Sequence, residues 1–333
     1  HGIVQAFPDM VSLRDIGDSE ARITAKVLGC TKRVWEDEFD YFFLPCLRLN
    51  KYKCVQDWFA QKREEALSLG VQNFSDSEKK AWYKAQSFEI EVAGIPHTFG
   101  FGGLHGATEK PSHFKGALYH VDVNNYYPSM LIAWNLVTRA ATNDNYTKVY
   151  KTRKALKYKQ THSETKAEAK KWKKAQLPYK KMLNALSGGM KDKTNAAYDP
   201  RNNNCMCING QLMLLDLIEH LEVIPGFQLI QSNTDGLIVQ VPDTDEAFDL
   251  MDDICWEWEQ RCSTDRCEIL LELDCIHEIY QKDVNNYLWV DLDGGVERIG
   301  KYVKELSSID NDLPILNKAL VEYMVHGTPV EQT

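Results

Sequence analysis

The clearest alternation of apolar and polar residues lies in the middle of the chain, over residues 117–123. Its period of two places Val121 and Val123 on one face of a strand and Asp122 on the other. A turn follows, in which Pro128 stands where a proline commonly begins a helix. The pattern predicts a strand that ends in a polar turn and leads into a helix.

Several segments have the periodicity of a helix. Residues 55–68, 211–222 and 245–260 each carry apolar residues at helical spacing, and 211–222 is strongly amphipathic. Thr244 is placed to cap the last of these helices. The segment 149–189 is rich in Lys, Ala, Glu and Leu, which favour helix, so we expect two antiparallel helices here.

Two features divide this helical segment. Residues 160–163 predict the bend between its helices, and the second helix is expected to begin near Glu164. Pro178 predicts an interruption within the second helix, and Gly188-Gly189 is typical of a C-terminal stop.

Further strands are predicted on both sides of the helices. Residues 227–241 predict a hairpin around the Asn-Thr-Asp-Gly turn at 233–236, and residues 267–273 predict a strand. The glycine-dense segment 97–106 predicts a loop, either a flexible connector or one whose backbone approaches a phosphate chain. The element order predicts an α+β fold, an antiparallel sheet with helices on one face and a helical insertion.

Composition restricts the class of protein. The 333 residues suggest about two domain-sized units, and 44% hydrophobic with 26% charged residues is typical of globular proteins. No stretch approaches the ~18 apolar residues of a membrane helix, and no secretory signal opens the chain. The nine cysteines form no CxxC pair, which predicts reduced thiols in an intracellular protein. Because the chain opens at His1, we expect a fragment or a processed product.

Charge is unevenly distributed along the chain. The net charge is −9, yet residues 148–181 hold thirteen of the 39 Lys and Arg residues and only two of the 48 acids. A basic arm on an acidic body indicates a polyanion partner, a solvated helix face, or both.

Two acids at the ends of predicted strands, Asp122 and Asp235, carry the candidate chemistry. Singly, each has an ordinary structural interpretation, because acids form turns and caps and Asp-Gly is common in hairpins. Together they could form a carboxylate pair, and hard oxygen ligands suit Mg²⁺, which keeps waters and bridges substrate phosphates.

Cations and polar groups share single faces of the predicted basic helices. Lys180, Asn184 and Gly188 fall at i, i+4 and i+8 on the second helix, and Arg153 and Lys157 at i, i+4 on the first. A lysine-rich helix is commonly just solvated. Opposite paired carboxylates, however, these rows have the layout expected for a triphosphate with metal ions.

At this point the chain resembles a known family. Residues 122–129 (DVNNYYPS) resemble motif A of family B DNA polymerases, D-x-x-S-L-Y-P-S, and residues 180–188 (KKMLNALSG) resemble motif B, K-x-x-x-N-S-x-Y-G. Residues 232–236 (SNTDG) resemble motif C, x-D-T-D-S, in the family's order. The spacing of Arg153 and Lys157 is similar to the R-x-x-x-K of the fingers helix. Gly102-Gly103 is similar to the Y-x-G-G element of the phage, protein-primed branch, without its tyrosine.

The resemblance covers about residues 98–290 and implies a polymerase right hand without a recognisable exonuclease domain. It implies a palm of antiparallel sheet with helices on one face, a helical fingers insertion and a small or clipped thumb. The expected divisions are an N-terminal segment (1–105), a first palm segment (106–145), fingers (146–190), a second palm segment (191–288) and a whole or partial thumb (289–333).

The resemblance also implies an activity, the template-directed addition of deoxynucleotides to a primer 3′-hydroxyl. Asp122, Asp235 and the carbonyl of Val123 would hold two Mg²⁺, for which Mn²⁺ could substitute. Tyr127 would lie under the sugar and exclude a 2′-hydroxyl. The residues expected on the triphosphate are Arg153, Lys157, Lys180 and Asn184, and those expected on DNA are Gly102, Gly103, Gly188 and Tyr287.

The implied partners are primer-template DNA, dNTPs and a separate exonuclease chain or other replication proteins, with no membrane. The implied location is the bacterial host cytoplasm if the chain is phage-encoded.

Three positions depart from the motifs. Asn233 replaces the first acid of motif C, Ser187 replaces the motif B tyrosine, and Asn285 stands where the K-x-Y element before the thumb has lysine. Two alternatives therefore stay open. One is a catalytically inactive polymerase-like scaffold that binds nucleic acid in a replication complex. The other is an unrelated phosphate-binding α+β enzyme.

Overall fold

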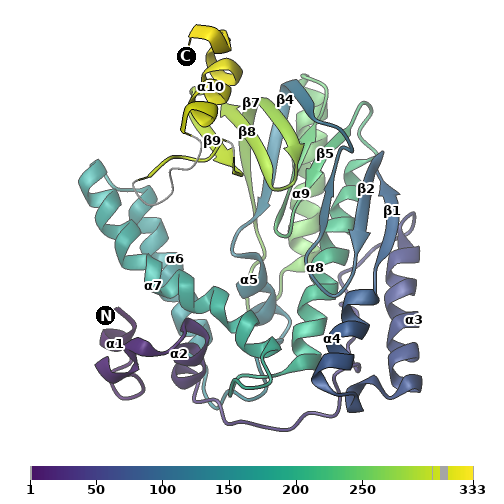
Figure 1. The fold of residues 1–333 in the computed structure, drawn as a ribbon, viewed down its shortest axis with the longest axis vertical. Helices are drawn as coiled ribbons and strands as arrows, with labels where there is room; N and C mark the ends of the chain where they lie inside the picture. The colour runs from purple at the N-terminus through teal and green to yellow at the C-terminus, as the bar shows by residue number, and fades with distance from the viewer. Residues whose placement is uncertain (1, 302, 308–313, 333) are drawn as a thin grey trace.

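A nine-stranded antiparallel sheet organises the computed structural model, which describes residues 2–301, 303–307 and 314–332 (Figure 1). The strand order is β1-β2-β3-β5-β6-β4-β7-β8-β9. The strands are β1 (Phe88–Val92), β2 (Ile95–Phe99), β3 (His105–Ala107), β4 (Ser112–Val123), β5 (Gln228–Ser232), β6 (Gly236–Gln240), β7 (Leu271–Asp283), β8 (Asn286–Asp291) and β9 (Val296–Ile299). The predicted α+β class is confirmed.

The described residues also form ten α-helices. They are α1 (Gly2–Ala6), α2 (Glu20–Val27), α3 (Lys53–Leu69), α4 (Asp76–Ala85), α5 (Tyr126–Ala133), α6 (Asn145–Thr161), α7 (Lys166–Lys191), α8 (Pro200–Leu221), α9 (Asp245–Cys262) and α10 (Pro314–His326). None of the described helices is long and apolar enough to cross a membrane.

The main core lies between one face of the sheet and helices α8 and α9, which stand behind β4 and β5 in Figure 1. Along β4, Val121 and Val123 are buried in this core, as the alternation predicts. Leu118 points to the opposite face, where it packs with Ile238 and Ile276 in a much smaller cluster. Asp122 shares that sparsely covered face, so the sheet itself places the carboxylate outside the main core.

Helices α6 and α7 pack against each other as the predicted antiparallel pair and project from the lower part of the molecule (Figure 1). The predicted bend is present, since residues 162–165 join them. Two predictions about α7 are wrong. The helix continues through Pro178, against which Gly2 packs, and it ends at Lys191 rather than at Gly188-Gly189. A Cβ on Gly189 would lie 3.4 Å from the Asn195 side chain, an ordinary contact distance, so the helix passes through both glycines without needing either to end it.

Helix α8 differs most from its prediction. It begins at Pro200, before the predicted residues 211–222, and eighteen of its 22 residues are buried, so it is not an amphipathic surface helix. Asn204 donates to the carbonyl of Glu38 (3.1 Å) and Asn209 to that of Phe42 (2.9 Å). These asparagines therefore hydrogen-bond the N-terminal segment, a contact that helix propensity does not anticipate.

The remaining predictions are mostly confirmed. The helix over 55–68 is α3, the hairpin is β5 and β6, and Thr244 caps α9 by accepting from the N–H of Ala247. The predicted strand 267–273 starts later, at Leu271, and runs on to Asp283. The predicted loop 97–106 is only half loop, because its ends belong to β2 and β3 and residues 100–104 connect them.

Beyond the carboxylate-bearing strands, α10 packs on β8 and β9 through Val321, Val303 and Leu288. The expected boundary between palm and thumb at 288/289 falls within β8. Residues 302, 308–313 and 333 of the expected thumb lie outside the described residues. The division into palm, fingers and thumb stays a prediction.

Candidate active site

Asp122 lies at the end of β4, between two other strands. It is opposite Gly236 of β6 on one side and Glu272 of β7 on the other. A Cβ atom on Gly236 would lie 2.9 Å from the carbonyl oxygen of Val121 and 3.1 Å from Oδ1 of Asp122. Because a side chain there would collide with β4, glycine lets the turn before β6 approach the Asp122 carboxylate closely.

The turn between β5 and β6 brings the second predicted carboxylate to the same place. The N–H of Val123 donates to the backbone carbonyl of Asp235 at 2.8 Å, which fixes the turn against the end of β4. Asn233 accepts from the N–H of Thr234 (2.8 Å) through Oδ1, so the residue in the first acid position of motif C organises the turn. The side chain of Asp235 is exposed.

The carboxylates around Asp122 interact electrostatically. Burial, and then the charges of Asp235, Glu272 and Asp274, raise the pKa of Asp122 to about 7. Lys157 acts in the opposite direction and lowers it. The negative charge at the end of β4 is thus only partly balanced by the protein, and a bound cation would stabilise the ionised form.

A cavity of about 360 Å³ opens on this face of the sheet. Asp122 and Asp235 line it together with Asn233, Tyr287 and Trp289, among others. The ring of Tyr287 stacks on that of Trp289, with centroids 5.5 Å apart. Burial is the first cause that raises the pKa of Tyr287, to about 12, so its phenol is a neutral hydrogen-bonding group beside the carboxylates.

Helix α6 supplies one cation directly to the carboxylates. Lys157 Nζ lies 2.6 Å from Oε1 of Glu272 and 3.4 Å from Oδ1 of Asn124. Arg153, one turn earlier, is 8% exposed, and its Nε has no hydrogen-bond partner among the described residues. Burial lowers the pKa of this guanidinium, so an anion would relieve an unfavourable environment.

The predicted face of α7 is exposed. Lys180, Asn184 and Gly188 all lie on the solvent side of the helix, and their spacing gives the single row that the sequence predicts. Among the described residues, none forms an ion pair or hydrogen bond with Lys180 Nζ. The described contacts therefore do not join this row to Asp122 or Asp235, unlike Lys157.

Tyr127 and the glycine segment border the same region. The ring of Tyr127 lies over Gly210, where a Cβ would be 2.9 Å from Cε1, and it stacks on Tyr126. Burial raises the pKa of Tyr127, and Asp235 contributes in the same direction. Gly103 lies against Thr234, whose Oγ1 would be 2.7 Å from an added Cβ. The glycine segment thus contacts the turn that carries Asp235.

The donor set at the strand ends suits a hard divalent cation. Asp122, Asp235 and the backbone carbonyl of Val123 offer oxygen atoms, the ligand type that Mg²⁺ prefers. Within residues 2–301, 303–307 and 314–332, no group of three or more His, Cys, Asp or Glu side chains could hold a metal ion by itself. Oxygens of a phosphate-bearing substrate would have to supply the remaining ligands.

Three neighbours of the site were not among the predicted residues. Glu272 and Asp274 project from β7 beside Asp122, and Asn124 accepts from Lys157. The sequence LELD at 271–274 alternates apolar and acidic residues, so an acidic strand face could have been predicted. Its pairing with β4 could not, because strand order is a tertiary property.

No protein-family model matches the sequence, and no curated protein matches it. Among solved structures, the chain is similar to the family B DNA polymerase of the hyperthermophilic archaeon Pyrobaculum calidifontis, with a TM-score of 0.43 and 14% identity. The alignment covers 72% of this chain and 34% of that polymerase. The chain thus has a distant structural similarity to about a third of a family B DNA polymerase.

Proposed function

We propose that this chain is the polymerase portion of a template-directed DNA polymerase, which adds deoxynucleotides to a primer 3′-hydroxyl. The observation that carries the proposal is the meeting of Asp122 and Asp235. They come from segments more than a hundred residues apart in sequence, yet they line one cavity and are joined by the hydrogen bond from Val123 to Asp235. The motif-like segments around both acids support the same activity.

The uncompensated charge at Asp122 supports a metal-dependent reaction. Mg²⁺, when bound, would make the primer hydroxyl more acidic and stabilise the leaving pyrophosphate. Asp122, Asp235 and the Val123 carbonyl are the proposed ligands, with Mn²⁺ as a substitute for Mg²⁺. The raised pKa of Asp122 means that loss of its proton accompanies cation binding near neutral pH.

The cations of α6 and α7 would hold the triphosphate. Lys157 already lies at the edge of the carboxylate group, paired with Glu272, and would exchange this partner for a phosphate oxygen. Arg153 offers a guanidinium that lacks a described partner at Nε. Lys180 and Asn184 would add contacts from α7 when that exposed face meets the nucleotide. Charge on the phosphate oxygens increases as the bond breaks, so these contacts strengthen in the transition state.

Two aromatic residues would position the substrates. Tyr127 is fixed by its packing over Gly210 and its stacking on Tyr126, and such a rigid ring could exclude a ribose 2′-hydroxyl. Tyr287 lines the carboxylate cavity and would contact the primer strand. Gly102, Gly103 and Gly188 would let the backbone approach DNA closely.

Primer extension tests the proposal. With a labelled primer-template, dNTPs and Mg²⁺, the parent protein should lengthen the primer. The Asp235→Asn protein should add nucleotides roughly 10³-fold more slowly but bind DNA as tightly as the parent. An Asp235→Asn protein that extends at nearly the parent rate would remove this residue from the active site.

An inactive scaffold remains the second candidate, and one observation favours it. Asn233, in the position of the first motif C acid, uses its side chain to cap the turn instead of offering a carboxylate. A parent protein that binds primer-template tightly but never extends it, with either Mg²⁺ or Mn²⁺, would support the scaffold.

A further inference from the structure

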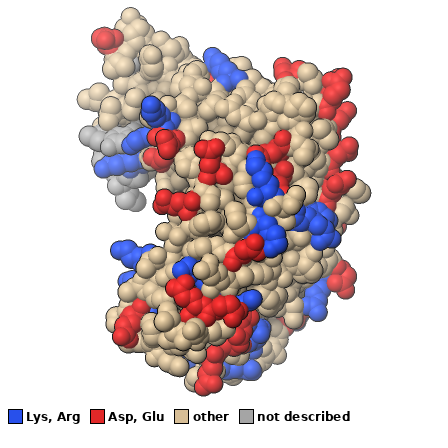
Figure 2. Space-filling model, turned by 90° about the vertical axis from the view of Figure 1, so that its right-hand side faces the viewer, with Lys and Arg blue, Asp and Glu red and all other residues tan. Residues whose placement is uncertain are grey.

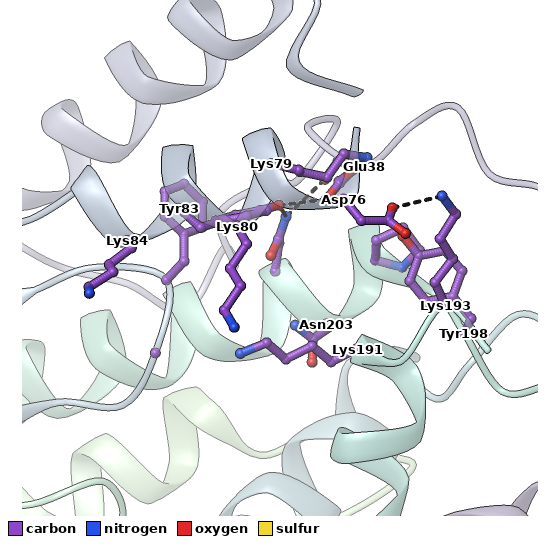
Figure 3. Close-up of a pocket in the computed structure, with 14 residues that line it drawn as sticks. Glu38, Asp76, Lys79, Lys80, Tyr83, Lys84, Lys191, Lys193, Tyr198 and Asn203 are labelled. Carbon is purple, nitrogen blue, oxygen red and sulfur yellow. Dashed lines mark hydrogen bonds and ion pairs between the residues drawn. The ribbon is translucent and has the colours of Figure 1, made fainter. Parts of the chain in front are cut away.

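A second cavity, of about 640 Å³, lies outside the carboxylate site. It forms where α4, the connector 100–104, the end of α7 and the start of α8 meet, as Figure 3 shows. It shares no lining residue with the cavity around Asp122. The two are nevertheless connected along the chain, because Gly102 lines the second cavity and Gly103 contacts Thr234 beside Asp235.

Lysines dominate the walls of this cavity. Lys79 and Lys193 are neutralised by ion pairs with Glu38 (2.6 Å) and Asp76 (2.9 Å). The other three are Lys80, Lys84 and Lys191, and among the described residues none of them has an ion-pair partner. Figure 3 shows the side chains of Lys80 and Lys191 directed toward one another from α4 and α7. Two facing ammonium groups repel, so an anion between them would be stabilised by both.

A buried amide lies beside these lysines. Asn203 of α8 is 7% exposed and lines the cavity near Lys191 (Figure 3). Within the described part of the chain, its side chain has no hydrogen-bond partner. Its amide atoms are not among the buried side-chain atoms that lack a partner, so they reach the cavity and are open to a polar ligand. Its NH₂ group would donate to an oxygen of the anion that Lys80 and Lys191 attract.

Aromatic rings complete the lining. Phe101 and Tyr198 are half-buried and line the cavity, together with Tyr83, whose hydroxyl donates to Glu38 at 2.8 Å. Phe101 and Tyr83 pack edge to face with centroids 5.0 Å apart, which holds both rings in place. A basic groove with aromatic side chains is the layout that binds single-stranded nucleic acid, since phosphates meet the cations and bases stack on the rings.

We infer that this cavity binds a single-stranded segment of nucleic acid, with a phosphate held by Lys80, Lys191 and Asn203. The inference builds on the proposed function, in which the unpaired template strand would lie here and continue past Gly102 toward the carboxylates. The cavity is larger than a single phosphate requires, and Lys84, one helical turn after Lys80, offers a contact for a neighbouring phosphate.

The experiment compares two DNA probes in buffer without divalent cations, so that binding is measured apart from catalysis. One is a duplex with a ten-nucleotide 5′ template overhang, and the other is the same duplex with blunt ends. Lys80→Ala/Lys191→Ala should weaken overhang binding about tenfold and leave blunt-duplex binding unchanged. The slope of log K against log salt should also fall by about 1.4, the value for two phosphate contacts on a single strand.

Two further variants serve as controls. Lys53→Ala/Lys110→Ala removes the same charge from exposed positions outside the cavity and should leave both affinities within twofold of the parent. Lys80→Arg/Lys191→Arg should restore overhang binding. Equal losses on both probes, or equal losses in the control, would overturn the inference.

Two more arms separate the remaining explanations. Inorganic phosphate or dAMP that binds as tightly as the overhang, with the same dependence on Lys80 and Lys191, would show a small-anion site and overturn the strand assignment. Primer extension by the same parent protein reports on the proposed function separately. If overhang binding depends on the two lysines but the primer is not extended, the strand site is upheld and the polymerase is rejected. If the primer is extended but overhang binding does not depend on the lysines, the polymerase is upheld and the strand site is rejected.

Discussion

The carboxyl group of Asp122 is half-buried beside three other acids, and this has a consequence for stability. Burial and like charges raise its pKa to about 7 in the folded protein, against about 3.9 in an unfolded chain. Between these two values the folded state holds a proton that the unfolded state has lost. The contribution of Asp122 to stability is therefore fully present below about pH 4 and is lost as pH rises through about 7.

We therefore expect Asp122→Asn to stabilise the protein at pH 8 by about 1–2 kcal/mol, after allowance for the partial exposure of the carboxyl group. At pH 4.5 the gain should be much smaller. Thermal unfolding without divalent cations measures both values. Asp253→Asn on α9, an exposed acid outside the site, is the control and should show no such pH dependence. An equal effect of Asp122→Asn at both pH values would contradict the role of burial.

Divalent cations should largely cancel this difference between parent and variant. If Asp122 and Asp235 are metal ligands, Mg²⁺ or Mn²⁺ at ten times its dissociation constant stabilises the parent at pH 8 by about 1.4 kcal/mol. Asp122→Asn, which lacks one ligand, should gain little. The melting temperature of each protein, measured as each cation is titrated, tests this without an assay of activity. Equal stabilisation of both proteins would show that the cation binds away from Asp122.

At the scale of elements, α7 offers a test of which face meets the nucleotide. Lys180 and Lys181 are adjacent and both exposed, but Lys181 Nζ is paired with Glu20 of α2 at 2.8 Å. Lys180→Ala should raise the KM for dNTP about tenfold, because it removes a phosphate contact of about 1.4 kcal/mol. Lys181→Ala is the matched control and should leave KM unchanged. Steady-state kinetics at limiting dNTP measures both KM values. Equal KM values for the two variants would contradict the assignment of Lys180 to the triphosphate.

Helices α7 and α8 show that tertiary contacts can override local signals for where a helix begins, breaks or ends. Pro178 and Gly188-Gly189 predict breaks that do not occur: α1 packs beside the proline, and α7 runs through both glycines to Lys191. The asparagines of α8 disfavour helix in isolation, but here they hydrogen-bond the backbone of the N-terminal segment. The contacts of these asparagines compensate weak local propensity, and their partners, Glu38 and Phe42, are more than a hundred positions away.

At the scale of the whole molecule, Arg139 links the N-terminal segment to the sheet-bearing body. Its guanidinium donates to Asp199, the fully buried N-cap of α8, at 2.6 Å, and to Asp37 at 2.5 Å. Acidic side chains form several clusters on the face viewed in Figure 2, with basic ones among them, so attractive links of this kind matter for a chain of net charge −9. Because Asp37 belongs to the N-terminal segment and Asp199 caps α8, Arg139 connects that segment to a helix of the main core.

Arg139→Met should lower the free energy of unfolding by about 3–4 kcal/mol, since it leaves the buried Asp199 carboxylate without its charged partner. Arg139→Lys should recover some of the loss. Urea unfolding of the parent should be a single transition seen equally by far-UV circular dichroism and by tryptophan fluorescence. Two separate transitions would show that the N-terminal segment unfolds by itself.

The sequence by itself determined the elements whose signals are local. Alternation defined β4 and placed Asp122 opposite the core, the Asn-Thr-Asp-Gly turn defined the β5–β6 hairpin, and Thr244 marked the start of α9. Charge counting defined the basic helices, and the motif-like segments selected Asp122 and Asp235. These features depend on neighbours within a few positions, so hydrophobic period, turn chemistry and capping specify them.

Only the tertiary structure decided how these pieces combine. The strand order places β4 between β6 and β7, which brings Glu272 and Asp274 to Asp122 and gives Lys157 its partner. The basic cavity around Lys80 and Lys191 likewise joins residues from α4, α7 and α8. Strand order and helix packing depend on burying apolar surface across the whole chain, and no local pattern encodes which distant segments will share that core.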